Sequence, residues 1–405
     1  MANKNFTQFG LSSFAGNADY LVGYSKDGIQ ELRYTAGSLL TGGNYDFIIN
    51  GVNVGRGRGT DNIVLGASAL NTISTGRNNI AIGNLALSAC TTSNGNIAIG
   101  TNALASLTGV GSDNMAIGSF ALSGLKGDAY NLAIGNRSLK SAVGANPNTS
   151  LHRVVNNVAV GMDTMLAALT AMSNVVLGNY CLSEMLSGAG NTAVGTSAGA
   201  YNIFSGLNNT LVGSYTTLLN RATNCSVLGY QATTTGNNQV QLGDAATTTY
   251  AYGPVQERSD IRDKADVRDT ALGLDFIMAL RPVDFKWDLR DSYRTPPPAA
   301  LPPVATEEEK ENYKVLIEQW KQANDINNIV HDGTHERTRY HHGLIAQEVK
   351  QMLDDKGIDF GGYQDHSIKG GKDVQSIGYN ELVAPLIKAI QQLKQEFDAY
   401  KASHP

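Results

Sequence analysis

A serine and a lysine five residues apart could carry out nucleophilic chemistry in this chain. They are Ser259 and Lys264, within the segment Arg-Ser-Asp-Ile-Arg-Asp-Lys at 258–264. A serine hydroxyl can attack the carbonyl of the peptide bond that precedes it, giving an ester that water then hydrolyses. Because an alcohol is a weak nucleophile at its ordinary pKa, the reaction needs a base. Lys264 could serve if burial or nearby cations lowered its pKa.

The pair lies where the composition of the 405-residue chain changes. Between Asn62 and Gly243 the acidic residues are only Asp113, Asp128, Asp163 and Glu184. After Ser259 the sequence is rich in Asp, Glu, Lys and Arg. This change predicts at least two structural units that fold by different means.

Two motifs resemble a known family. They are Ser-Asp-x-Arg-x-Lys at 259–264 and Gly-Leu-Ile-Ala-Gln-Glu-Val at 343–349. Together they resemble the self-cleaving intramolecular chaperone domain (peptidase S74 family) at the C-terminus of phage tail fibres and tail spikes. The resemblance covers Ser259 to Pro405 and implies cleavage between Arg258 and Ser259 after a trimer has formed. Folding would then be irreversible and the stability of the fibre kinetic.

The resemblance also implies a role for each motif residue. Ser259 would be the nucleophile and Lys264 the base. The supporting residues would be Asp260 and Arg262, which fix the loop, and Gln347 and Glu348, whose role is less defined. The alternative is that Ser259 and Asp260 cap a helix or turn and that Lys264 is a solvated charge.

A repeated pattern, Asn-x-small-aliphatic-Gly, fills the middle of the chain. Its copies begin at Asn62, Asn79, Asn96, Asn114, Asn131, Asn157, Asn174, Asn191 and Asn209, and degenerate copies end at Gly55, Gly229 and Gly243. The glycines from Gly66 to Gly135 step by 17, 17, 18 and 17 residues, and the next step is 26, so one repeat carries an insertion at about 143–153.

We expect each repeat to form a coil of two short strands that stacks on the next coil. The middle alanine would point inward where space is limited, glycine would allow a bend, and the asparagines would form a ladder. The motif is similar to the head repeats of trimeric autotransporter adhesins, although the period here is longer. A homotrimeric β-helix or β-roll is the expectation for this shaft at 55–243, and a monomeric solenoid is the alternative.

Residues 1–54 contain three short alternating stretches, 20–24, 30–34 and 45–49, that predict strands. In a fibre this end would attach to the virion, or it could simply cap the shaft. Residues 244–258 would link the shaft to the cleavage site.

Residues 259–405 predict an α+β domain. A helix is expected over 269–280, a strand over 281–287 and a capping box from Thr306 to Glu309 that begins another helix. A proline-rich stretch, with prolines at 296–298 and 302–303, follows the strand. We interpret about 291–340 as an insertion relative to the resembling family. The last helix has a coiled-coil stripe formed by Val383, Leu386, Ile390, Leu393, Phe397 and Tyr400.

Several function classes are disfavoured by composition. A net charge of -5 without a basic run argues against nucleic acid, and no stretch approaches the apolar length of a membrane span. We interpret Cys90, Cys181 and Cys225 as buried thiols, and His331 and His335 as ordinary histidines without a metal. The scattered acids of the shaft argue against a glycosidase, and no cofactor is expected.

These observations favour a homotrimeric tail fibre or tail spike precursor, a structural protein for host attachment that acts once on itself as a Ser-Lys peptidase. Its partners would be its own copies, other virion tail proteins and a host receptor. It would be made in a host cytoplasm and reside in the virion tail. The alternative is a trimeric surface adhesin with an uncleaved C-terminal trimerisation cap.

Overall fold

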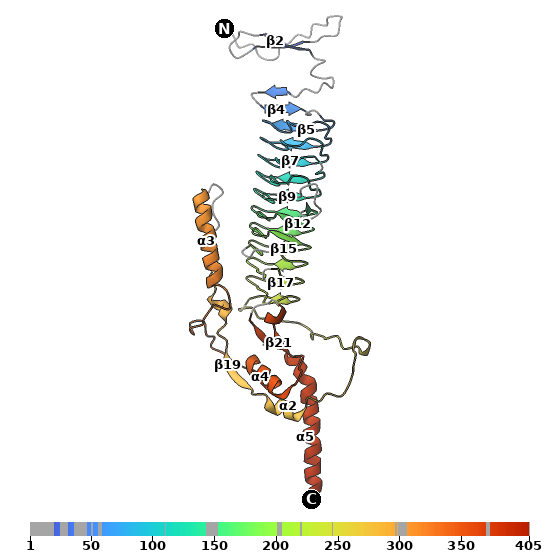
Figure 1. Ribbon diagram of the computed structural model, residues 1–405, viewed down its shortest axis with the longest axis vertical. Helices are drawn as coiled ribbons and strands as arrows, with labels where there is room; N and C mark the ends of the chain where they lie inside the picture. The colour runs from blue at the N-terminus through green and yellow to red at the C-terminus, as the bar shows by residue number, and fades with distance from the viewer. Residues whose placement is uncertain are drawn as a thin grey trace.

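The computed structural model describes residues 20–24, 31–35, 47–49, 52–55, 59–109, 111–142, 153–200, 205–218, 221–244, 246–295, 298, 306–369 and 373–404. Figure 1 shows a long β-solenoid followed by a helical unit at its C-terminal end, from which the last helix projects. The β-repeat shaft and the C-terminal helix predicted from the sequence are therefore present. The predicted insertion at 143–153 and the proline run fall largely outside the described residues.

The N-terminal strands pair antiparallel. β1 (Tyr20–Tyr24) pairs with β2 (Glu31–Thr35), and β3 (Phe47–Ile49) pairs with β4 (Val52–Gly55). These strands lie within a residue or two of the stretches predicted from alternation. β4 also pairs antiparallel with the first solenoid strand, so this segment continues the sheet of the shaft.

One sheet runs the length of the solenoid and is parallel from β5 onward. Its parallel strands are the centres of the Asn-x-small-aliphatic-Gly motifs and, at β17 and β18, of the degenerate copies that begin with Cys225 and Gln239. They are β5 (Ile63–Gly66), β6 (Ile80–Ile82), β7 (Ile97–Ile99), β8 (Met115–Ile117), β9 (Leu132–Ile134), β11 (Val158–Val160), β13 (Val175–Leu177), β15 (Thr192–Val194), β16 (Thr210–Val212), β17 (Ser226–Leu228) and β18 (Val240–Leu242). Equivalent residues pair, as Ala81 with Ala98, and the 26-residue repeat keeps this register because Leu132 pairs with Val158.

The second apolar run of most repeats forms a turn and not the second strand that we expected. In the coil after β6, Leu85 has φ 57° and Leu87 has φ 49°, and most other coils repeat this alternation of left-handed residues. A second strand forms only locally, as β10 (Val154–Val155), β12 (Thr170–Met172) and β14 (Ser187–Ala189). The expectation failed because alternating left-handed residues turn the chain back on itself, whereas a strand needs extended backbone throughout.

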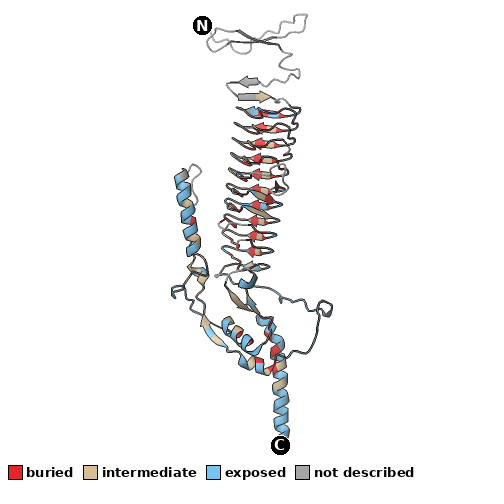
Figure 2. Cartoon of the chain, in the orientation of Figure 1, coloured by how far each residue is buried: buried red, intermediate tan, exposed pale blue. Residues whose placement is uncertain are grey.

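The core of the solenoid is filled from within one chain. The middle residue of each strand points inward, and Ala81, Ala98 and Ala116 have no exposed surface. The turn residues Leu87 and Leu104 fill the space opposite them. Figure 2 shows these buried residues as a red column through the coils. The prediction of small inward alanines is confirmed.

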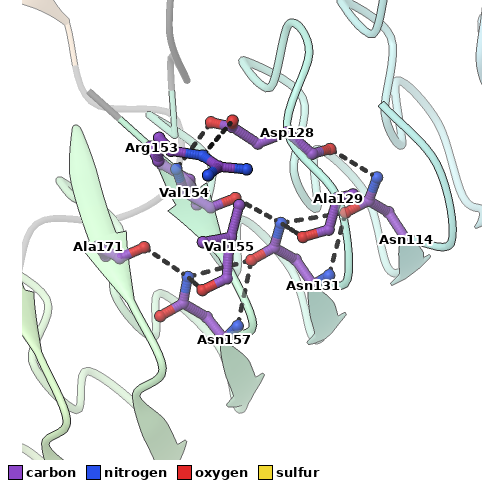
Figure 3. Close-up of polar contacts among 9 residues, drawn as sticks. All are labelled: Asn114, Asp128, Ala129, Asn131, Arg153, Val154, Val155, Asn157 and Ala171. Atoms are coloured by element: carbon purple, nitrogen blue, oxygen red, sulfur yellow. Dashed lines mark hydrogen bonds and ion pairs between the residues drawn. The ribbon is translucent and has the colours of Figure 1, made fainter. Parts of the chain in front are cut away.

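The asparagines form a continuous ladder, as the sequence indicated. Asn131 Nδ2 donates to Asn114 Oδ1 at 3.0 Å, and Asn157 Nδ2 donates to Asn131 Oδ1 at 3.0 Å. Figure 3 shows these three stacked amides beside Asp128, whose carboxylate accepts from the Val154 backbone at 2.7 Å. Because the amides from Asn79 to Asn209 are buried and bonded to the coils on both sides, the ladder ties each coil to its neighbours.

The helical unit is built around a small apolar core of Phe276, Val349, Leu353, Phe360 and Leu382. Its elements in order are η2 (Ile261–Asp263), α2 (Leu274–Ala279), β19 (Val283–Lys286), η3 (Arg290–Tyr293), α3 (Glu307–Ala323), β20 (Tyr340–Gly343), α4 (Ala346–Lys356), β21 (Tyr363–Asp365), η4 (Ser367–Lys369), β22 (Gln375–Ile377), η5 (Tyr379–Leu382) and α5 (Val383–Ser403). The helix expected over 269–280 is shorter than predicted, and the capping box of α3 is confirmed.

β19 pairs directly with β20, so the residues between them form an excursion from a hairpin. Within this excursion α3 extends alongside the shaft in Figure 1, and Lys321 Nζ lies 3.4 Å from Glu184 Oε2 of the solenoid. None of the helices in the described residues is both long and apolar enough to cross a membrane.

Candidate functional site

The predicted nucleophile and base are in direct contact. Lys264 Nζ donates to Ser259 Oγ at 2.8 Å. The one-turn helix η2 makes this contact possible because it bends the chain between the two residues, with the Lys264 backbone N–H donating to Ile261 O at 3.2 Å. A proton can pass between groups at this separation.

Asp260 and Arg262 are hydrogen-bonded to each other within this turn. Asp260 is the N-cap of η2, and its Oδ1 accepts from the Arg262 backbone N–H at 2.9 Å and from Arg262 Nε at 3.0 Å. The hydrogen bonds from the Arg262 side chain and backbone lower the pKa of Asp260. The same contact raises the pKa of Arg262.

Two further contacts hold the residues before Ser259, and the sequence analysis did not identify them. Arg258 Nε lies 2.7 Å from Asp263 Oδ2, so an ion pair spans the Arg258–Ser259 peptide bond. Asn380 Nδ2 of η5 donates to Glu257 Oε1 at 2.5 Å. The opposite charges five residues apart were a usable signal for the first contact, whereas the second depends on tertiary structure.

The segment is exposed apart from Asp260, which is half-buried. Ser259 and Lys264 are both open to solvent, and Figure 1 shows the chain between β18 and α2 running outside the body of the helical unit. The burial that would help a lysine act as a base is therefore not provided by the described residues of one chain.

The downstream motif residues lie elsewhere. Gln347 and Glu348 are in the first turn of α4, and Glu348 Oε2 accepts from Arg281 Nε at 2.8 Å. These hydrogen bonds from Arg281 lower the pKa of Glu348. The fold thus brings Ser259, Lys264, Asp260 and Arg262 together but does not add the Gln-Glu pair to them.

The other candidate groups have structural surroundings. His331 Nδ1 lies 3.4 Å from Asp288 Oδ2, and His335 packs edge-on against Tyr293. Across the described ranges, no cluster of His, Cys, Asp and Glu has the arrangement of a metal site. The three cysteines are free and buried, as expected, and burial raises the pKa of Cys181 to about 12. Such thiols are poor nucleophiles.

Comparisons with known protein families, with curated proteins and with solved structures found no match for this chain.

Proposed function

We propose that this chain is the precursor of a homotrimeric tail fibre or tail spike for host attachment, whose C-terminal unit drives assembly and then cleaves itself off between Arg258 and Ser259. The observation that carries the proposal is the 2.8 Å contact between Lys264 Nζ and Ser259 Oγ. This contact lies in the connection between the solenoid and the helical unit, where a cut would separate the two.

The chemistry follows from the atoms in place. Neutral Lys264 accepts the hydroxyl proton while Ser259 Oγ attacks the carbonyl carbon of Arg258. The amide nitrogen of Ser259 then leaves and takes up a proton, which gives an ester between Arg258 and the serine oxygen. Water hydrolyses the ester to a carboxylate on Arg258 and a free hydroxyl and α-amine on Ser259.

Assembly would supply the burial that the single chain lacks. The segment around the dyad exposes several large apolar side chains, with Tyr250 88%, Val255 82% and Ile261 64% exposed. Contact with another copy would cover these side chains and would remove water from around Lys264. Because a buried lysine loses its proton more readily, the cut would follow assembly.

The last helix supports self-association. The residues of its predicted stripe remain exposed in the single chain, with Ile390 67%, Leu393 56% and Tyr400 60% exposed. Such a stripe over the length of α5 is stable only when another apolar surface covers it. Equivalent helices of other copies would provide that surface.

A second function is favoured by the exposure of the dyad and by the position of Glu348. In this alternative the C-terminal unit is a permanent trimerisation cap on an adhesin-like structural protein. Ser259 and Asp260 would then serve only to cap the η2 turn.

Intact mass of the purified full-length chain distinguishes the two. Wild type is expected to yield fragments 1–258 and 259–405, whereas Ser259→Ala and Lys264→Ala stay whole. Ser403→Ala, at the end of α5, is the matched control and should be cut like wild type. If wild type forms a stable trimer and remains uncut, the self-cleavage proposal is wrong and the permanent cap is favoured.

A further inference from the structure

The parallel sheet of the solenoid has two columns of outward side chains. In the strands of the long sheet from β5 to β17 the second residue is buried and the first and third residues are outward, and in β18 the second residue, Gln241, is half-buried. The first column is Ile63, Ile80, Ile97, Met115, Leu132, Val158, Val175, Thr192, Thr210, Ser226 and Val240. The second column is Leu65, Ile82, Ile99, Ile117, Ile134, Val160, Leu177, Val194, Val212, Leu228 and Leu242. We call these two columns the aliphatic face.

The aliphatic face is apolar along the whole shaft. All its members are Ile, Leu, Val or Met except Thr192, Thr210 and Ser226, and no outward position in these described strands carries a charge. The side chains are at least partly open to solvent, with Ile63 54% and Val240 70% exposed at the two ends of the sheet. Soluble monomers rarely expose continuous apolar surface on this scale, so the face indicates a contact surface.

The length and spacing of the face specify the occupant. Neighbouring strands of a sheet lie about 4.8 Å apart, so the columns repeat at that interval for roughly 48 Å between β5 and β18. A partner must present uncharged apolar side chains at the same spacing over the same length. A second copy of this shaft meets both conditions, because its own face has the same columns.

We propose that the aliphatic face is the surface through which shafts of this chain contact one another, side by side, parallel and at the same level. This inference rests on the proposed homotrimer and locates its interface. Around a threefold axis, the first column of one copy faces the second column of the next.

Coverage of the whole face favours the same level. The two columns run from β5 to β18 in every copy, and Ile63 and Val240 at their ends are 54% and 70% exposed in the single chain. A shift by several coils would leave aliphatic side chains at both ends of the sheet uncovered, which is unfavourable. At equal level each first-column residue faces the second-column residue of the same strand in the next copy, so the whole face is covered.

Cysteine trapping in the full-length chain tests the proposal. Val175→Cys and Leu177→Cys each place a thiol in one column of β13, and a double variant places one in both. The native cysteines are buried and do not compete. Lys126→Cys is the control because Lys126 is exposed but lies outside the sheet. After mild oxidation, mass is measured under denaturing, non-reducing conditions.

The double variant is expected to form covalent trimers, and each single variant at most covalent dimers. Ile97→Cys with Ile99→Cys, on β7, should give the same result, and the control should remain monomeric. When the β7 and β13 double variants are coexpressed, disulfides should join β7 to β7 and β13 to β13, and should not join β7 to β13. The thiols are on the shaft side of Ser259, so the result does not depend on cleavage.

Three results would overturn the inference. A chain that is trimeric by native mass but shows no shaft cross-links associates elsewhere, for example through α5, and the homotrimer would stand without this interface. Links between β7 and β13 positions would show that the copies are not at the same level. A monomeric native mass would remove both the interface and the homotrimer.

Discussion

The contact between Ser259 and Lys264 is formed by residues that are close together in the sequence. Their contact needs only the turn of η2, which Asp260 stabilises by accepting from the Arg262 backbone and side chain. The Arg258–Asp263 ion pair closes the same loop from the other side of the peptide bond. Because both supports are exposed, their contribution is to orientation more than to stability.

Loosening this turn should therefore slow cleavage. In Asp260→Ala the cap of η2 and the partner of Arg262 are lost, and we expect the rate of self-cleavage to fall roughly 10- to 100-fold, as small misplacements of reacting groups do. A gel time course after synthesis measures the rate. Asp269→Ala removes a nearby exposed carboxylate and should be cleaved normally. Equal rates for the two variants would show that Asp260 has no part in positioning the dyad.

The asparagine ladder is a second feature that depends on individual residues. Asn96 Nδ2 donates to Asn79 Oδ1 at 3.2 Å and to Gly111 O at 3.1 Å, and its Oδ1 accepts from the Asn114 backbone at 3.0 Å. With no surface open to water, these groups depend on one another for their hydrogen bonds.

Asn96→Ala should lower the free energy of unfolding by about 2–4 kcal/mol, because it leaves buried partners on both neighbouring coils unsatisfied. Thermal unfolding and hydrogen exchange of the adjacent strands measure the loss. Asn71→Ala, at an exposed turn position, is the matched control and should change little. A loss no larger than that of the control would mean that water replaces the ladder.

Residue types predicted the ladder because it depends on local spacing, whereas the pairing of Ser259 with Lys264 was implied by the family resemblance. The repeat of Asn with Ala two residues later predicted both the stacking and the inward face. The position of Glu348 could not be predicted this way, since Arg281 binds it through the tertiary fold. The exposure of Lys264 likewise depends on what surrounds an extended segment.

Among the elements, the turns of the solenoid differ most from the sequence prediction. The apolar run at 85–87 suggested a strand, but Leu85 and Leu87 are left-handed. Hydrophobic pattern alone does not distinguish a strand from a turn whose alternate residues point inward. The motif glycines were predicted correctly as bends, because their φ angles of 112° to 148° from Gly66 to Gly229 are hard for any other residue.

Substitution of Gly100, which follows β7, and of Gly109, which lies in a turn, compares a crowded glycine with an open one. Gly100 has φ 133°, and a Cβ there would lie 2.6 Å from the backbone C and O of Gly118 in the next coil. Gly109 also has a positive φ, but a Cβ there would meet nothing within 4 Å. Gly109→Ala should cost about 1–2 kcal/mol of stability for its conformation alone.

Gly100→Ala should lower the free energy of unfolding clearly more than Gly109→Ala does, because two coils must also move apart. The unfolding free energies of both variants, measured by denaturant titration, give the comparison. Equal losses would show that the coils can separate without penalty, which would contradict the close packing of their backbones.

In the whole molecule, the helical unit covers the end of the solenoid where its core runs out. The middle residue of β18 is the polar Gln241 in place of alanine. Nearby, His366 Nδ1 lies 2.6 Å from Thr235 Oγ1 and 3.2 Å from Gln239 Nε2, and His366 Nε2 lies 3.2 Å from Ser376 Oγ. Gln239 also accepts from the Thr235 backbone, so the histidine contacts a turn that exists only in the folded coil.

This contact should weaken in acid. With its proton on Nε2, His366 donates to Ser376 and accepts at Nδ1 from Thr235 and Gln239. Protonation of Nδ1 would set its N–H against the Gln239 amide donor. Burial lowers the pKa of His366 from the ordinary 6.5, although Asp365 opposes the shift. Because the docked side chain binds a proton less well than the free one, docking is strongest above pH 6.5 and weakens as the pH falls below that value.

Hydrogen exchange in the uncut Ser259→Ala chain tests this contact without relying on cleavage. Corrected for intrinsic rates, protection of the backbone at 235–243 should fall between pH 7.5 and pH 5, by up to about tenfold for each unit by which the pKa is lowered. Adding His366→Gln should remove most of this pH dependence, whereas adding His404→Gln, at the exposed end of α5, should leave it intact.

Glu184 acts in the opposite direction, because burial raises its pKa and the docked carboxyl favours protonation. Protection that rises toward pH 5 would therefore assign the pH response to Glu184 and its contact with Lys321, and would show that His366 does not control how the helical unit holds the end of the shaft.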